Sequence, residues 1–164
     1  LELQEDAFIS QIKIAKKHKL PIVIHVRDSF NETIEIVEKL NDENLSGVFH
    51  CFTGDVNQAQ RIIDLQDFYL GIGGVLTFKN SGLDNTIKHI DISHLLLETD
   101  APYLAPSPFR GKRNESKYIK NIAEKLAEIH GISLNDIANI TTKNALTAET
   151  YDTYSKYLHN NTTT

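Results

Sequence analysis

Short apolar runs alternate with segments of helical periodicity along the chain, and this alternation restricts the fold more than any other feature of the sequence. The runs lie near residues 20–26, 47–52, 68–74 and 94–99. Strands that alternate with helices pair in parallel, because each return to the same end of a sheet needs a crossover. We therefore expect an α/β fold with four parallel strands and outer helices. A doubly wound sheet and a (β/α) barrel share this pattern.

The segments between and after these runs show the helical spacing of apolar residues. They cover residues 4–19, 29–41, 56–66, 81–90, 115–131 and the stretch that begins at Ser133. Ser29 with Glu32 predicts a capping box, Ser133 predicts an N-cap, and Gly131 predicts a helix end. Residues 101–114 hold three prolines and a glycine, which predict a loop. We expect one partial barrel domain over residues 1–159 and a frayed tail over residues 160–164.

Polar side chains stand at the ends of three of the apolar runs. His25 and His50 end the first two runs, and Glu98 and Asp100 end the fourth. The carboxyl ends of parallel barrel strands lie on one face, where active sites form. Two imidazoles and a carboxylate on that face are a ligand set for Zn²⁺ or a similar ion. One histidine there is as often a core residue bonded to backbone, but two in successive strands with an aspartate favour a metal site.

The sequence also predicts roles for the residues around these ligands. Asp100 is interpreted both as a metal ligand and as the catalytic base that takes a proton from water. Glu98 and Arg27 are predicted to orient the ligands, although Glu98 is equally well explained as a solvated carboxylate. The other histidines fall on helices or loops and are predicted to be surface residues: His18, His89, His94, His130 and His159.

A cluster of cations follows the acidic strand end directly. Arg110, Lys112 and Arg113 lie within four consecutive positions in "FRGKRN". Such a cluster is ordinarily a solvated turn, but its place beside the predicted metal site favours a phosphate clamp, with arginine bonding in bidentate fashion. Further substrate contacts are predicted for residues near the strand ends. Phe52 and Tyr103 would stack on a base or wall a pocket, Lys79 would reach a phosphate, and Gly71, Gly73 and Gly74 would let the backbone approach the ligand.

Composition limits the class of protein and its compartment. The formal net charge is −5, so any contact with nucleic acid needs a local basic patch. Cys51 is the only cysteine, which favours a reducing compartment: the cytoplasm or, in a eukaryote, the nucleus. No apolar run approaches the ~18 residues of a membrane span. The sequence has no methionine, even at position 1, so we expect a piece of a longer protein.

Five segments of the chain resemble, in order, the TatD family of metal-dependent deoxyribonucleases. They are "LPIVIHVRDS", "GVFHCFTGD", "YLGIGGVLTFKN", "LLLETDAPYLAPSPFRGKRNE" and "TTKNAL". The resemblance runs from Gln4 to Leu146 and implies the C-terminal half of a TIM-like (β/α)₈ barrel. It implies hydrolysis of DNA phosphodiester bonds, with 3′–5′ exonuclease action on single-stranded DNA as the expected mode. It also implies a divalent ion, Mg²⁺ or Zn²⁺, held by His25, His50 and Asp100.

The sequence departs from the family at its start. The family opens with a His-x-His pair on its first strand and has a further glutamate ligand before the helix that begins this chain, and neither occurs here. The missing N-terminal half of the barrel is therefore expected to be required for a complete site. Two other interpretations stay open. One is a metal-dependent hydrolase of a small cyclic amide, against which the basic loop counts, and the other is an inactive remnant that lacks the N-terminal ligands.

Overall fold

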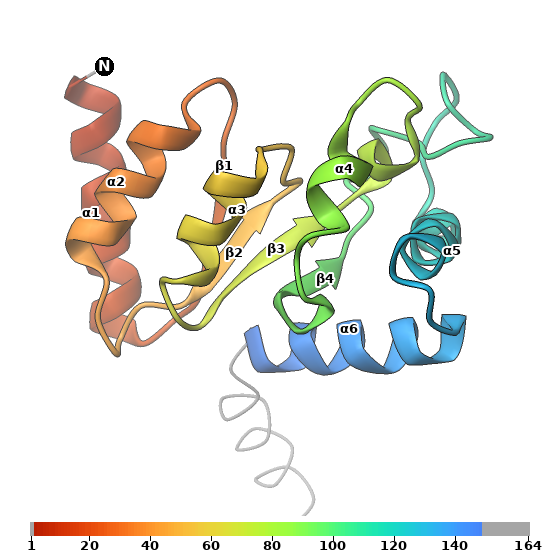
Figure 1. Ribbon diagram of the computed structural model, residues 1–164. Helices are drawn as coiled ribbons and strands as arrows, with labels where there is room; N and C mark the ends of the chain where they lie inside the picture. The colour runs from red at the N-terminus through yellow and green to blue at the C-terminus, as the bar shows by residue number, and fades with distance from the viewer. Residues whose placement is uncertain (1, 149–164) are drawn as a thin grey trace, which may run out of the picture.

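The computed structural model describes residues 2–148, and its centre is a four-stranded sheet in the order β1-β2-β3-β4 (Figure 1). The strands are β1 (Ile22–His25), β2 (Gly47–His50), β3 (Phe68–Ile72) and β4 (Leu95–Leu97). Every neighbouring pair is parallel, so the predicted α/β fold with four parallel strands is confirmed. The strands are shorter than the apolar runs. In the run at 68–74 the strand ends at Ile72, and the last glycine of the run begins a 3₁₀ turn, Gly74–Thr77.

Helices precede the first strand, connect the strands and follow the last one. They are α1 (Glu2–His18), α2 (Phe30–Leu40), α3 (Val56–Ile63), α4 (Leu83–Ile87), α5 (Ile119–His130) and α6 (Leu134–Ala148), with 3₁₀ turns at Ile92–His94 and Ser116–Tyr118. The predicted frayed tail and His159 lie outside the described residues. None of the helices in the described part of the chain has the length and apolar character of a membrane span.

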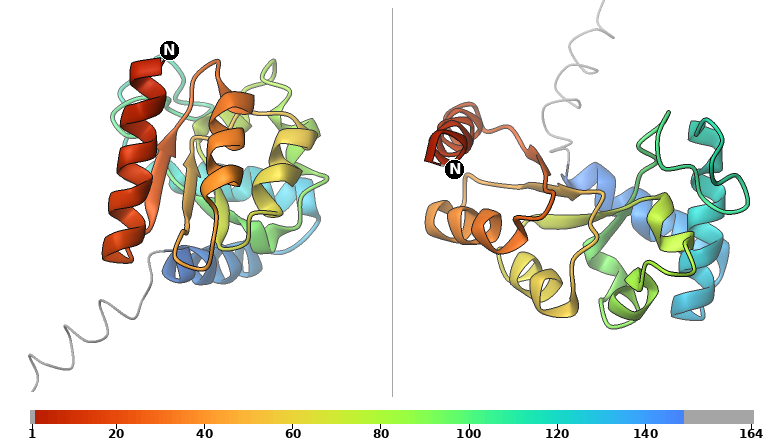
Figure 2. Two further views of the ribbon diagram at one scale, coloured as in Figure 1. Left: turned by 90° about the vertical axis from the view of Figure 1, so that its left-hand side faces the viewer. Right: turned by 90° about the horizontal axis from the view of Figure 1, so that it is seen from above.

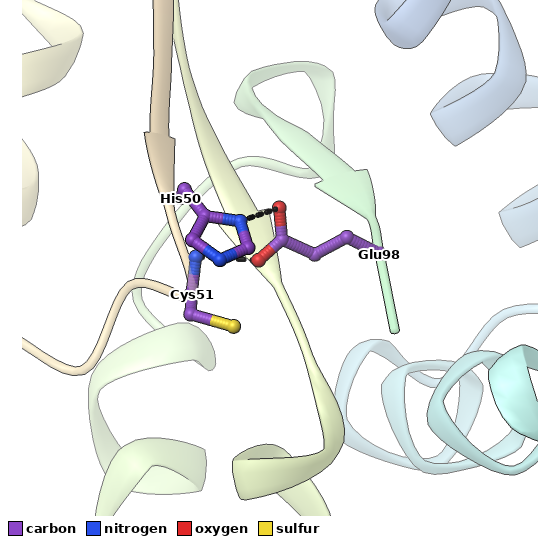
Figure 3. Close-up of side chains that lie close together, drawn as sticks. All are labelled: His50, Cys51 and Glu98. Carbon is purple, nitrogen blue, oxygen red and sulfur yellow. Dashed lines mark hydrogen bonds and ion pairs between the residues drawn. The ribbon is translucent and has the colours of Figure 1, made fainter. Parts of the chain in front are cut away.

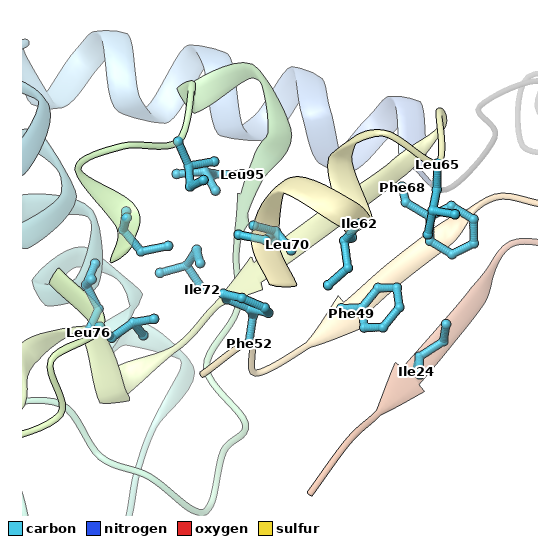
Figure 4. Packing of buried hydrophobic residues seen from close by; sticks show 14 of the residues in the cluster. Ile24, Phe49, Phe52, Ile62, Leu65, Phe68, Leu70, Ile72, Leu76 and Leu95 are labelled. Carbon is cyan, nitrogen blue, oxygen red and sulfur yellow. The ribbon is translucent and has the colours of Figure 1, made fainter. Parts of the chain in front are cut away.

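One row of buried side chains crosses the whole sheet. Ile24, Phe49, Leu70 and Leu95 are register partners in successive strands, and each is almost fully buried (Figure 4). Their face packs against the helices, which surround the sheet on one side (Figure 2). Because side chains alternate along a strand, the next residue of each strand points to the opposite, inner face. The register that forms the core therefore also sets the row of residues on the inner face.

Among residues 2–148, no further strand pairs with the two edges of the sheet, and the inner face is exposed at β1. The edge strands are β1 and β4, and Val23 on the inner face of β1 is 72% exposed. A closed barrel would cover such positions, because its inward side chains fill the interior in layers. The described residues therefore form half of a barrel, as the sequence predicted.

Helix caps differ in part from the prediction. Gly131 ends α5 with a left-handed backbone, and Ser133 Oγ accepts a hydrogen bond from the Asp136 N–H, as predicted. The capping box at Ser29 is wrong, because the Ser29 hydroxyl donates to the Arg27 carbonyl instead of accepting from the helix. The capping box of the fold lies at α3, where Asp55 and Gln58 bond each other's backbone N–H groups.

Two of the histidines predicted to lie at the surface are half-buried. His18 and His89 are exposed, but His94 and His130 are not. The His130 Nε2 atom is buried and has no hydrogen-bond partner among the described residues. Burial lowers the pKa of His130, and the nearby Asp91 carboxylate opposes that shift. His130 is the last residue of α5, and the preceding residue, Ile129, packs against the hydrophobic core.

The lowered pKa of His130 predicts a loss of stability at mildly acid pH. The unfolded chain binds the proton more readily, so the free energy of unfolding falls as the pH drops below the ordinary histidine pKa of 6.5. His130→Gln should reduce this pH dependence, whereas His18→Gln, at an exposed position, should leave it unchanged. Urea unfolding between pH 5 and pH 7.5 measures both, and equal slopes for the two variants would contradict the prediction.

Candidate metal centre

Register places the two predicted histidine ligands side by side. His25 and His50 are direct partners at the carboxyl ends of β1 and β2, and their ring centroids lie 5.8 Å apart. Both follow a buried outward residue, so both point to the inner face. His25 is exposed and His50 is half-buried. The parallel pairing therefore brings together two imidazoles that are far apart in the sequence.

Residues with a left-handed backbone follow the strands that hold the candidate ligands. They are Asp28 beyond β1 (φ 59°), Cys51 after β2 (φ 47°) and Asp100 beyond β4 (φ 53°). Aspartate adopts this conformation more readily than most side chains. At Asp100 the turn brings the carboxylate back toward β2, where its Oδ1 atom lies 3.3 Å from His50 Nε2. The structure thus places Asp100 against the second histidine.

Glu98 supports His50 at its other ring nitrogen. Glu98 Oε2 lies 3.0 Å from His50 Nδ1, and Glu98 Oε1 accepts a hydrogen bond from the Cys51 N–H (Figure 3). These two contacts fix the orientation of the ring and leave Nε2 facing Asp100. A carboxylate on the far nitrogen is the usual support of a metal-bound histidine. The side chain is only 16% exposed, which favours the orienting role over that of a solvated carboxylate.

Gly71 gives Glu98 the space to reach His50. Glu98 comes from the end of β4 and His50 from β2, and β3 lies between them. A Cβ atom at Gly71 would collide with the Glu98 carboxylate, and one at Gly74 would collide with the Leu104 carbonyl. Gly71 and Gly74 thus serve the packing of the chain against itself, and the predicted close approach of the backbone to a ligand stays a prediction. They admit neighbouring parts of the chain.

The donor atoms around His50 are compatible with a small divalent ion. Two donors that each bond one ion at about 2.0–2.2 Å lie about 3.3–3.6 Å apart when the angle at the ion is tetrahedral. The 3.3 Å between His50 Nε2 and Asp100 Oδ1 falls in that range. The His25 ring lies 5.8 Å from the His50 ring, but His25 is not among the described residues whose donor atoms lie within 4.8 Å of one another, so its role as a third ligand stays a prediction. Imidazole with carboxylate suits zinc and similar ions.

Cys51 is a neighbour of the site that the sequence did not identify. Donor atoms of His50, Cys51 and Glu98 all lie within 4.8 Å of one another. Burial raises the pKa of the Cys51 thiol, and the hydrogen bond and charge of Glu98 raise it further. Glu98 is engaged with both other residues, through His50 Nδ1 and the Cys51 N–H. We interpret these three residues as support for the His50 ring and not as a second metal site.

The predicted phosphate-binding residues lie on exposed segments. Arg110, Lys112, Arg113 and Lys79 are all exposed. The Arg110 guanidinium lies 4.3 Å from the centre of the Phe78 ring, a cation–π contact that holds it beside the segment of Lys79. The Asn114 N–H donates to the Pro102 carbonyl at 3.0 Å, which joins the end of the basic loop to the turn of Asp100.

The two aromatic candidates have different environments. Tyr103 is 69% exposed beside Asp100, as a base-stacking residue must be. Phe52 is 1% exposed and packs edge-on against Phe30 with ring centroids 5.4 Å apart. The prediction that Phe52 stacks on a base is therefore wrong. Its Cys51 neighbour turns the chain after β2, and the ring enters the core.

Arg27 lies two residues after His25, beside the site. It is exposed and lines a cleft of about 450 Å³ together with His25 and Phe8, at the edge of β1 next to α1 and α2. Its predicted role in orienting a ligand stays a prediction.

Glu98→Gln should weaken metal binding about 10–100-fold, because the amide can no longer attract the His50 N–H with a full charge. Calorimetric titration of the chain with Zn²⁺ measures the affinity. Glu35→Gln, at an exposed position on α2, is the matched control and should bind Zn²⁺ as the parent does. Equal affinities of all three proteins would show that Glu98 does not support a ligand.

A parallel half-barrel with histidine and carboxylate side chains at its strand ends has the arrangement of the metal-dependent hydrolases. A family model described as TatD related DNase matches residues 1–149, and the chain belongs to this family. Relatives in this family are named metal-dependent hydrolases.

Relatives and solved structures agree on the extent of the match. The chain is 43% identical over 145 residues to an uncharacterized metal-dependent hydrolase of Bacillus subtilis, covering 88% of this chain and 56% of that protein. It is 36% identical over 142 residues to one of Escherichia coli, covering 86% and 53%. The crystal structure of a TatD homologue from Escherichia coli superposes with a TM-score of 0.79 at 28% identity, covering 85% and 53%. The chain thus spans about half the length of the relatives it matches.

Proposed function

We propose that the protein containing this chain is a metal-dependent deoxyribonuclease that cleaves phosphodiester bonds of single-stranded DNA from the 3′ end. The observation that supports this best is a hydrogen bond between the turn of Asp100 and the basic loop. The turn that holds Asp100 at His50 is hydrogen-bonded to the loop of Arg110, Lys112 and Arg113. A nucleophile site and an anion site therefore adjoin. A neutral cyclic amide would gain nothing from three exposed cations, which counts against the amidohydrolase alternative.

The described residues have separate tasks in this proposal. His25, His50 and Asp100 would hold the ion, and Glu98 keeps the His50 ring in place. When bound, a divalent ion lowers the pKa of a coordinated water and neutralises charge on the phosphoryl oxygens. Asp100 accepts the proton of the attacking water. Arg113 and its neighbours bind the phosphates, and Tyr103 stacks on a base.

We also propose that this half of the barrel acts together with the other half. Within residues 2–148 the edge strands of the sheet are β1 and β4, and unpaired edges are templates for further strands. An apolar cleft of about 550 Å³ lies between Leu97 at the β4 edge and the helices α5 and α6, lined there by Ile119 and Leu134. His25 stands at the other edge, exposed to the space that a neighbouring strand would fill. The complete ligand set then needs residues that this chain lacks.

A chimera tests the proposal. It joins the upstream half of the Bacillus subtilis relative to Leu1 of this chain, and is incubated with Mg²⁺ or Zn²⁺ and single-stranded DNA labelled at its 5′ end. We expect a ladder that shortens from the 3′ end, and no product above background from the 164-residue chain by itself. Absence of hydrolysis by the folded, metal-bound chimera would exclude the nuclease. Turnover by the isolated chain would exclude the need for the other half.

A further inference from the structure

Two buried asparagines bind the two ends of β4 in the same way. Asn114 is 2% exposed and its Nδ2 donates to the Thr99 and Tyr103 carbonyls, each at 2.6 Å. Asn144 is 7% exposed and its Nδ2 donates to the Ile92 and Leu95 carbonyls, at 2.8 and 2.6 Å. Each amide uses both of its N–H donors on main-chain carbonyls. Of the two pairs of carbonyls, only the pair bound by Asn114 flanks a candidate metal ligand, Asp100.

The carbonyls that Asn114 binds lie on either side of Asp100. Residues 99–103 form a turn in which the Tyr103 N–H donates to the Asp100 carbonyl at 2.8 Å. The Asn114 side chain spans this turn, and its backbone N–H bonds the Pro102 carbonyl inside it. Asp100 has a left-handed backbone, which costs free energy unless surrounding contacts hold it. The Asn114 amide supplies those contacts.

Asn114 is also the residue that follows Arg113. Its Oδ1 atom accepts a hydrogen bond from the Glu115 N–H at 2.9 Å, so the side chain is fixed to its own segment as well as to the turn. One side chain therefore joins the Asp100 turn to the basic loop. An amide is suited to this task because it donates twice and accepts without adding charge beside a cation site.

We propose that Asn114 is the positioning residue that holds Asp100 at the metal centre and keeps it in register with the basic loop. The inference rests on the proposed role of Asp100 as a metal ligand. Asn144 has the same chemistry and comparable burial at the amino end of β4, so it separates an effect on the site from a general loss of packing.

The test measures Mn²⁺ affinity of the 164-residue chain by water-proton relaxation, together with its thermal midpoint. Asn114→Ala should weaken Mn²⁺ binding about 10–100-fold, the size expected for the loss of a group that orients a ligand. Asn144→Ala should lower the thermal midpoint by a similar amount and leave Mn²⁺ affinity unchanged. Asn114→Ser keeps one donor and should give an intermediate affinity, and it replaces the alanine variant if that variant does not fold.

Asp100→Ala separates the inference from the function on which it rests. If Asp100→Ala weakens Mn²⁺ binding and the Asn114 variants do not, the positioning role is wrong while the metal role of Asp100 stands. Equal losses from Asn114→Ala and Asn144→Ala would likewise overturn the positioning role. If Asp100→Ala itself leaves Mn²⁺ affinity unchanged, the proposed ligand set is wrong.

Discussion

Replacing Asp100 by asparagine in the chimera is expected to lower the rate of DNA hydrolysis by about 10²–10⁴-fold, the usual contribution of a general base. The amide has the same size and tolerates the left-handed backbone of this position, with φ 53°, so the turn should persist. It cannot accept the proton of the attacking water, and it is a weaker partner for a cation near His50 Nε2. DNA affinity, measured by fluorescence anisotropy in the presence of metal, should change little because the basic loop is intact.

Arg113→Ala is the reverse case and serves as the control. It removes an exposed phosphate partner and leaves the side chains around His50 untouched. DNA binding should weaken and its salt dependence should flatten by a slope of about 1, while the hydrolysis rate of saturated enzyme stays near that of the parent. Retention of most activity in Asp100→Asn, at full metal occupancy, would remove Asp100 from the chemistry.

Phe52→Ala is expected to lower the free energy of unfolding by about 3–5 kcal/mol, the range for loss of a buried phenylalanine. Phe52 is almost fully buried against Phe30. A loss of this size is a large part of the ~5–15 kcal/mol that stabilises an ordinary domain. Urea unfolding followed by circular dichroism measures the difference.

Tyr103→Ala is the matched comparison for Phe52→Ala. Its ring is exposed, so the free energy of unfolding should change by less than ~0.5 kcal/mol. If Tyr103 stacks on a base, its loss should weaken single-strand binding by ~1–3 kcal/mol. A stable Phe52→Ala protein with weakened DNA binding would return Phe52 to the binding surface and contradict the packing described here.

The parts of the fold that the sequence predicted depend on short-range patterns. Apolar runs gave the four strands, and their alternation with helices gave parallel pairing, because both follow from backbone geometry. His25 and His50 were found because each ends such a run. The carboxyl ends of neighbouring parallel strands lie next to each other, so the two histidines were expected to lie side by side.

Other features depend on contacts that the sequence does not encode locally. Gly71 admits Glu98 only because register puts β3 between His50 and β4. Phe52 enters the core because the chain turns at Cys51, and a left-handed backbone at a cysteine has no sequence signal. The Asn114 bonds to Thr99 and Tyr103 close a loop whose path only tertiary structure reveals.

The left-handed turns at Asp28, Cys51 and Asp100 have a consequence for protein engineering. Glycine adopts this backbone without the steric cost of about 1 kcal/mol that a side chain adds, so a library selected for thermal resistance would enrich glycine at all three positions. At position 51 the exchange would remove only a half-buried thiol. At position 100 it would delete the carboxylate beside His50. Selection for heat tolerance and selection for turnover would therefore fix different residues at the same site, and stabilised descendants would be recognised by their loss of catalysis.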